Sequence, residues 1–300
     1  MIRFGLCCVF KEHPIKFRRT TASYLARFSE EEQKKRLARL CAENAQSLAR
    51  ALDFCQKNNI GSFRINSQIL PLKTHPDMGY DIGDLPGSQE LIRAFKACGE
   101  FSLTHDIRTT FHPDQFIVLS SPRPDVVQRS VSDLEYQAQV AEWVNADVIN
   151  IHAGGVYGDK PSAISRLMKT IDTLSDPIRK RLTLENDDKS YSPHDLLPVC
   201  RDLKIPLVYD VHHHRCLPDG LAVETATQRA LDTWNREPLF HLSSPKNGWD
   251  GPSPGKHHDF IDPNDLPRHW IPMDITVEIE AKAKEIAVKQ LMADLKFIHT

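Results

Sequence analysis

The chain has 300 residues, with 38 Lys and Arg against 40 Asp and Glu and a formal net charge of −2. This balance excludes a protein that binds nucleic acid through bulk positive charge, although it allows a local basic patch. The 40% of hydrophobic and 26% of charged residues are typical of a globular protein and exclude a disordered one.

The N-terminal residues 1–10 are mostly apolar and predict a first strand. They are too few for a signal peptide, and no run of about 18 apolar residues predicts a transmembrane helix. The 7 cysteines show no C-x-x-C spacing, which argues against both a zinc knuckle and a disulfide framework. We therefore expect reduced thiols, a cytoplasmic location and no contact with a membrane.

Helices and strands alternate along the rest of the chain. Apolar residues at helical spacing predict a long helix to about Asn58, and Ser29 with Glu32 has the form of a capping box at its start. Further helices are predicted at about 88–98, 124–141, from Ser192 onward, at 221–234 and at 281–296. The predicted strands after the first are 62–66, 108–111, 147–151, 182–184, 207–209, 239–241 and 275–280.

About eight alternations of strand and helix predict a parallel α/β protein. At this length we expect a single (β/α)8 TIM-barrel domain over residues 1–300, with its site at the C-terminal face of the strands. A doubly wound open sheet is the alternative fold. Against it, no G-x-G-x-x-G follows the first strand and no phosphate-binding loop occurs, so we expect no nucleotide cofactor.

Imidazoles and carboxylates recur where the predicted strands end. A single histidine is more often a surface or core residue, but the same residue classes follow six successive strands, and in a barrel these ends meet on one face. Such side chains suit divalent metals, which predicts a multinuclear metal site. The candidate ligands at or after strand ends are His75, His112, His152, Glu185, Asp210, His213, His241, His258 and Glu280.

Nine candidate ligands are more than one ion uses, so we expect two or three ions that share bridging carboxylates. Ions ~3.5–4 Å apart suit phosphoester hydrolysis. A TIM-barrel sugar isomerase or epimerase with one or two metals would use the same face and is the alternative function.

Short motifs in a fixed order resemble the UV-damage endonuclease family, relatives of endonuclease IV among TIM-barrel metalloenzymes. The resemblance extends from residue 1 to about residue 290. It rests on Met1–Gly5, His112–Phe116, Ile151–Gly155, Leu184–Asp187, Asp210–His213, His241–Ser244 and Glu280–Glu285.

This resemblance implies a metal-dependent DNA repair nuclease that nicks the phosphodiester 5′ of UV photoproducts or other distorting lesions in duplex DNA. It implies that all nine candidate ligands bind divalent ions, with manganese the expected metal and zinc the alternative. Glu185, Glu280 and His241 would act in catalysis, and Glu185 would bridge two ions. We expect a monomer, since no long heptad pattern occurs. This monomer would associate with the nucleoid when it acts on DNA.

Gln115 and Phe116 match the family's pair that enters the duplex at the lesion. An aromatic ring can fill the gap that unstacked bases leave, and an amide can bond to their edges. The alternative is that Phe116 belongs to the core. Contacts to the DNA backbone, with solvated surface charges as the alternative, are expected from Arg18, Arg19, Lys189, Lys246 and Lys256.

Two positions depart from the family. Leu6 stands where the family usually has tyrosine, and Leu239 stands where it has a lysine that can be carboxylated. Lys256 is a candidate substitute for this lysine. These departures keep a third function open, a catalytically weakened protein that binds distorted DNA.

Overall fold

The computed structural model describes residues 2–298, so Met1 of the predicted first strand lies outside the described residues. Eight parallel strands form a closed barrel in the order β1 to β8, each hydrogen-bonded to its neighbours in sequence, and β8 closes on β1. The predicted (β/α)8 barrel is therefore confirmed, and the open sheet is wrong. The strands are β1 Arg3–Cys7, β2 Ser62–Ile65, β3 Arg108–Phe111, β4 Val148–His152, β5 Leu182–Glu185, β6 Leu207–Asp210, β7 Leu239–Leu242 and β8 Thr276–Ile279.

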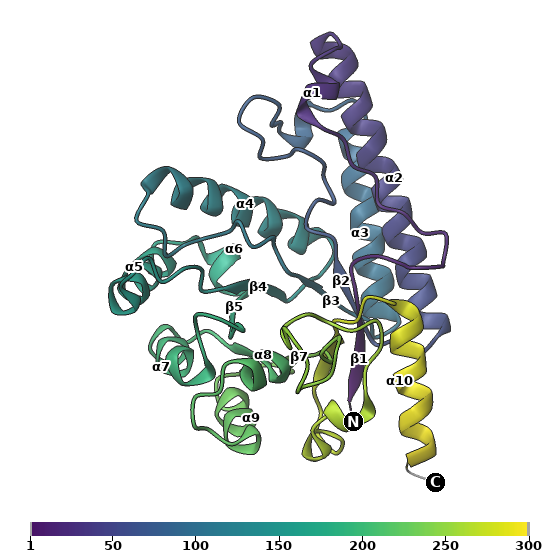
Figure 1. Cartoon of the computed structure of the whole chain (residues 1–300). Coiled ribbons are helices and arrows are strands. Elements are labelled where there is room, and N and C mark those ends of the chain that lie inside the picture. Colours follow the sequence, from purple (N-terminus) through teal and green to yellow (C-terminus); the bar gives the residue numbers. More distant parts are fainter. Residues whose placement is uncertain (1, 299–300) are drawn as a thin grey trace.

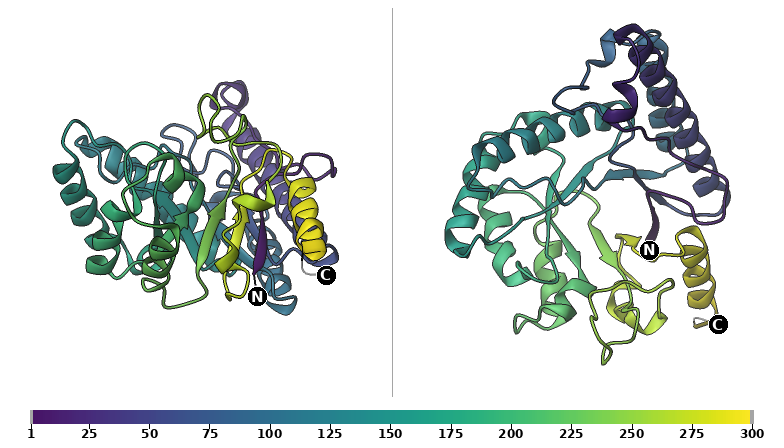
Figure 2. Two further views of the ribbon diagram at one scale, coloured as in Figure 1. Left: turned by 60° about the horizontal axis from the view of Figure 1, so that its bottom comes forward. Right: turned by 45° about the horizontal axis from the view of Figure 1, so that its top comes forward.

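Helices surround the barrel, and α2 with α1 projects farthest from it (Figures 1 and 2). The α-helices are α1 Ala22–Leu25, α2 Glu30–Lys57, α3 Ser88–Thr104, α4 Pro124–Trp143, α5 Lys160–Asp172, α6 Asp176–Arg179, α7 Pro193–Leu203, α8 Val211–Cys216, α9 Val223–Leu231 and α10 Glu285–Ile298. Three short 3-10 helices are η1 Ile82–Asp84, η2 Pro263–Asp265 and η3 Arg268–Trp270.

Helix starts follow the capping chemistry of the sequence. The Ser29 hydroxyl accepts a hydrogen bond from the backbone N–H of Glu32, and Ser192 with Asp195 forms a complete capping box at the start of α7. The last helix was predicted from residue 281 but begins at Glu285. Residues 281–284 instead form a turn in which Lys284 has a left-handed φ of 54°, which interrupts any helix before it.

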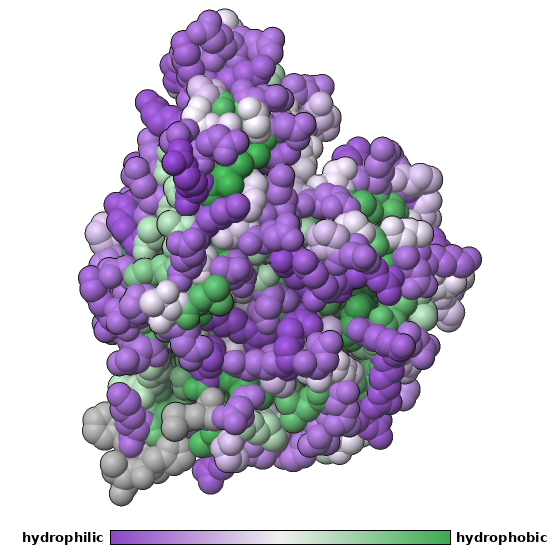
Figure 3. Space-filling model, turned by 180° about the vertical axis from the view of Figure 1, so that it is seen from behind, coloured by the Kyte–Doolittle hydropathy of each residue, from purple (hydrophilic) through white to green (hydrophobic). Residues whose placement is uncertain are grey.

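Most of the apolar core lies between the strands and the surrounding helices, where residues such as Phe240, Tyr209 and Trp270 pack ring against ring. The space-filling view shows mainly hydrophilic residues on the face seen, with hydrophobic residues in separate small patches (Figure 3). Within residues 2–298, no helix combines the length and apolar composition needed to cross a bilayer.

The lumen of the barrel is polar near the carboxyl ends of the strands. Thr110 on β3 donates to Glu278 on β8, and Arg64 on β2 contacts His241 on β7. These strands are not neighbours in the barrel, so the contacts cross its interior. Leu239, two residues before His241 on the same face of β7, packs in a small apolar cluster with Val148 and Val208.

The Glu285 carboxylate anchors the loop after β1. It accepts hydrogen bonds from the backbone N–H groups of Lys11, Glu12 and His13 at 2.7–2.9 Å. Burial alone would raise the pKa of Glu285, but these donors hold it below its ordinary value. The Glu285 carboxylate therefore holds the loop after β1 against the start of α10, and this contact depends on its negative charge.

We expect Glu285→Gln to lower the free energy of unfolding at pH 7 by about 2–3 kcal/mol, because the amide loses the negative charge and places an NH2 donor or a single neutral oxygen where two charged oxygens accept three N–H groups. The stability from a lowered pKa is present above the ordinary value of about 4.3 and is lost as the pH falls through the folded-state pKa. Urea unfolding should thus show a difference from wild type that shrinks below about pH 4. Glu31→Gln, at an exposed position of α2, is the control, and an equal loss in both variants would contradict the role of Glu285 as an anchor.

Candidate metal centre

Six of the nine predicted ligands lie at or next to the carboxyl ends of six strands. Residues His152, Glu185, Asp210 and His241 lie at the ends of their strands, and His112 and Glu280 follow β3 and β8 directly. His213 comes from α8, a short helix that was not predicted. The Asp210 side chain caps this helix by accepting the backbone N–H of His213 at 2.7 Å, which folds the His213 ring back over the site.

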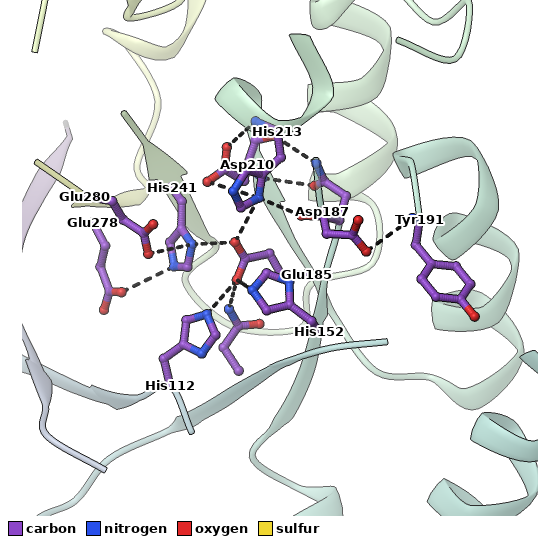
Figure 4. A network of polar contacts seen from close by, with 12 residues as sticks. His112, His152, Glu185, Asp187, Tyr191, Asp210, His213, His241, Glu278 and Glu280 are labelled. Atoms are coloured by element: carbon purple, nitrogen blue, oxygen red, sulfur yellow. Dashed lines mark hydrogen bonds and ion pairs between the residues drawn. The ribbon is translucent and has the colours of Figure 1, made fainter. Parts of the chain in front are cut away.

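Glu185 is at the centre of the network (Figure 4). It is fully buried, and Asn150 donates to its Oε2 at 2.5 Å. Oε2 also lies 2.9 Å from His112 Nε2 and 3.9 Å from His152 Nε2. Oε1 contacts two further imidazoles, His241 Nδ1 at 3.0 Å and His213 Nδ1 at 3.4 Å. One carboxylate thus faces four imidazoles.

These charges shift one another's proton affinities. Burial would raise the pKa of Glu185, but His241 and His152 hold it well below its ordinary value. Burial would lower the pKa of His241, but Glu185 and Glu280 raise it to about 10. Burial lowers the pKa of His152, which therefore favours the neutral form that binds a metal.

The donor atoms form three groups that could each hold an ion. Within each group the ligand atoms lie within 4.8 Å of one another: His112, His152 and Glu185; His112, His241 and Glu280; and Glu185, Asp210 and His213. Two buried atoms, Asp210 Oδ2 and His152 Nδ1, have no hydrogen-bond partner among the described residues. Mixed imidazole and carboxylate donors suit divalent transition metals, so the residues fit such ions. Glu185 belongs to two groups, as a bridging carboxylate would.

Two predicted ligands are not members of these groups. His75 Nδ1 accepts from the backbone N–H groups of Asp77 and Met78 at 3.2 Å, and His258 Nδ1 accepts from Phe260 N at 2.9 Å. Both rings are fixed by these bonds through the same nitrogen. Their roles as ligands stay predictions.

The sequence reasoning missed Arg64 and Glu278. Arg64 is buried with Nε 2.5 Å from Glu278 Oε2, Nη1 2.6 Å from Glu280 Oε1 and Nη2 2.8 Å from His241 Nε2. Glu278 also lies 3.3 Å from His241 Nε2. Arg64 therefore orients two candidate ligands, Glu280 and His241. A charged residue in the middle of a buried strand was the available signal, as was the spacing of two between Glu278 and Glu280.

His257 was also missed. Its Nδ1 lies 2.9 Å from the backbone oxygen of Glu280, and its ring packs on those of His212 and His213. An isolated bridge between Pro245 and His257 holds the loop that carries it. The long polar loop before β8 thus closes one side of the centre.

The predicted lesion probe is exposed. Phe116 has 74% of its surface exposed, and Gln115 beside it is exposed as well. The alternative that Phe116 belongs to the core is therefore wrong. The ring lines a cavity of about 280 Å³ together with His75 and Arg19.

Of the basic residues predicted at the DNA backbone, two have acidic partners. Arg18 Nε lies 3.0 Å from Glu43, and Lys189 Nζ lies 4.0 Å from Asp188. The other three each line a different surface cavity: Arg19, Lys246 and Lys256.

The two departures from the family pattern are Leu6 and Leu239. Both side chains are buried and pack among other apolar side chains.

Comparisons with known proteins cover the whole chain. Residues 2–300 match a family described as UV-endonuclease UvdE. A UV DNA damage endonuclease of Bacillus velezensis is 36% identical over 315 residues, which cover 99% of this chain and 95% of that protein. The crystal structure of SacUVDE superposes with a TM-score of 0.89 at 27% identity and covers 100% of this chain and 99% of that one.

More distant structures share the fold. Endonuclease IV of Thermus thermophilus has a TM-score of 0.60 at 14% identity, with 98% of each chain covered. D-Psicose 3-epimerase of Clostridium cellulolyticum has a TM-score of 0.58 at 12% identity, with 99% of this chain and 98% of that one covered. The sugar epimerases are thus related to this chain by architecture alone.

Proposed function

Since the chain belongs to the UV-endonuclease UvdE family, it is a DNA-cleaving hydrolase, and we propose that it nicks duplex DNA at the phosphodiester 5′ of UV photoproducts or other distorting lesions. The whole chain would act as one catalytic barrel domain. The family assignment and the donor set together favour this over a sugar epimerase.

The arrangement around Glu185 carries the proposal. Its two oxygens face four imidazoles from four segments of the chain, and it belongs to two of the three ligand groups. Divalent ions bound there would supply activation of the attacking water and neutralise charge in an in-line displacement at phosphorus.

The protein's own side chains would set the geometry of this step. Glu185 would bridge two ions, while Glu280 and His241 would hold the other side of the centre. Asn150 donates to Glu185 Oε2, and Arg64 bonds to both Glu280 and His241, so the bridging and flanking ligands are fixed before DNA arrives. His75 and His258 would complete the set from the surrounding loops.

The finer assignments are part of the proposal. Manganese suits a centre of imidazoles and carboxylates, and zinc is the alternative, with two or three ions in all. The substrate would be damaged double-stranded DNA, bound without a nucleotide cofactor. We propose that a monomer acts, in the cytoplasm on nucleoid DNA.

A nicking assay tests the function directly. The substrates are a labelled duplex with one pyrimidine dimer and its undamaged twin, and the protein is loaded with manganese. We expect one cut 5′ of the dimer, none in the twin, and loss of cutting with a chelator. Tight binding to the damaged duplex without any cut would instead favour a weakened binding protein, with Leu6 and Leu239 as the first positions to restore.

The exposed ring of Phe116 gives a prediction about lesion selectivity. Phe116→Ala should weaken binding to the damaged duplex roughly 5- to 150-fold, because a base–aromatic stack is worth about 1–3 kcal/mol. Binding to undamaged duplex should change far less. Fluorescence anisotropy with both duplexes measures the two effects.

Leu103→Ala is the matched control, since Leu103 is 68% exposed and lies at the end of α3 that leads into the start of β3, on the opposite face of the barrel. It should leave both affinities unchanged. Equal losses on the two duplexes in Phe116→Ala would rule out a lesion probe.

A further inference from the structure

A basic cavity of about 400 Å³ opens beside the metal centre. Lysines from two segments line it: Lys256 in the loop before β8, and Lys282 and Lys284 in the turn before α10. Glu280, a member of one ligand group, is the single acidic residue among those described as lining the cavity. The cavity and the centre therefore share a wall.

The segments that carry the lysines are fixed to each other. Lys282 N donates to the backbone oxygen of His258 at 3.1 Å, and Ala283 N donates to that of Asp259 at 2.9 Å. Lys256 O accepts from Lys246 N at 2.7 Å, which holds its loop in turn. The lysines thus project from a backbone that is already ordered.

The charges of the lysines are not satisfied by acidic partners. Within residues 2–298, no ion pair of Lys256, Lys282 or Lys284 is found. Glu285, next to Lys284, directs its carboxylate to the backbone N–H groups of residues 11–13. Glu280 accepts from Arg64, at 2.6 Å. The cavity therefore carries an excess of positive charge and suits an anion.

Two cysteines in the cavity lining add no negative charge. Burial raises the pKa of the Cys7 and Cys8 thiols, so they are neutral at pH 7. The charge of Lys284 reaches both sulfurs. An anion in the cavity would therefore meet the positive lysines, while the thiols would not repel it.

We propose that Lys256, Lys282 and Lys284 form a subsite for a phosphodiester that flanks the scissile bond in the damaged strand. This inference rests on the proposed nicking function: a strand with its scissile phosphate at the metal centre would extend away on both sides of it, and the cavity shares Glu280 with that centre. The subsite fixes the register of the strand without reading its bases. None of these three lysines contacts the candidate ligands through a described side-chain hydrogen bond.

The test is the salt dependence of binding to the dimer-containing duplex. The double variant Lys282→Gln/Lys284→Gln should bind more weakly, and the slope of log K against log salt should fall by about 0.9 for each phosphate that the protein no longer neutralises. Lys289→Gln is the control, because Lys289 lies exposed on α10 and does not line the cavity. It should leave the slope unchanged.

Methylphosphonate substitution locates the phosphate. A neutral methylphosphonate at one position flanking the scissile bond should weaken wild-type binding, and the double variant should be insensitive to it at that position. A slope equal to that of Lys289→Gln, or equal sensitivity of both proteins at every position, would overturn the subsite.

Measurements of binding and of cutting together distinguish failure of this inference from failure of the proposed function. Wild-type protein that cuts the lesion duplex, with a slope unaffected in the double variant, overturns the subsite alone. Wild-type protein that does not cut counts against the nuclease, while a lysine-dependent slope would still support the phosphate contact. Absence of binding by wild-type protein would overturn both.

Discussion

Glu185→Gln is expected to abolish nicking while the barrel stays folded. The amide keeps the size of the carboxylate but removes the charge that faces His112, His152, His213 and His241. A bound ion contributes several kcal/mol to such a reaction, and each 1.36 kcal/mol is tenfold in rate, so the loss should be at least roughly 10³-fold.

Three measurements are needed for this variant: its cutting rate, its metal content and its circular dichroism spectrum. Single-turnover cutting of the lesion duplex gives the rate, and the metal content of the purified protein shows whether ions are still held. We expect fewer bound ions and a circular dichroism spectrum like that of wild type. Glu142→Gln, which makes the same chemical change on the outer helix α4, should cut normally. Near-normal cutting by Glu185→Gln would remove Glu185 from the centre.

Arg64→Met is expected to have the largest effect on stability. The guanidinium lies in the lumen with two carboxylates, Glu278 at 2.5 Å and Glu280 at 2.6 Å. Removing one partner of a buried pair leaves an uncompensated charge, which costs about 3–5 kcal/mol. Urea unfolding of the metal-free protein measures this, and a loss below about 1 kcal/mol would contradict it.

A second substitution separates charge from packing. If the loss arises from unpaired charge, Arg64→Met/Glu278→Met should be more stable than Arg64→Met alone, because apolar side chains then replace both partners. Divalent ions should also restore part of the stability, since they would neutralise Glu280. Arg93→Met, an exposed arginine paired with Glu90 on α3, should change stability little. A double variant less stable than the single one would point to packing instead.

These two predictions differ in how far the sequence could support them. Glu185 was predicted as a ligand because it ends a buried strand, and strand ends meet on one face of a barrel. Arg64 was not, because a charged residue in a buried strand signals only that it has partners and does not say which residues they are. Its partners Glu278, Glu280 and His241 are more than 170 residues away in the chain.

The barrel, and the face of it on which the candidate ligands gather, could be predicted from the sequence alone. Alternating apolar segments and capping residues act locally, over a few residues, and so can be recognised without knowledge of contacts. The exposure of Phe116 and the start of α10 at Glu285 are different, because they depend on how loops pack once the barrel has closed.

Which side chains meet could be read only from the folded chain. The cap that Asp210 makes on α8 places His213 over Glu185, and the cavity of lysines 256, 282 and 284 joins segments from two sides of β8. Such groupings follow from contacts across the lumen and between loops, whose strengths depend on distance in space and burial. Spacing along the chain carries neither, so the chemistry of the strand ends was predictable while the network that orients it was not.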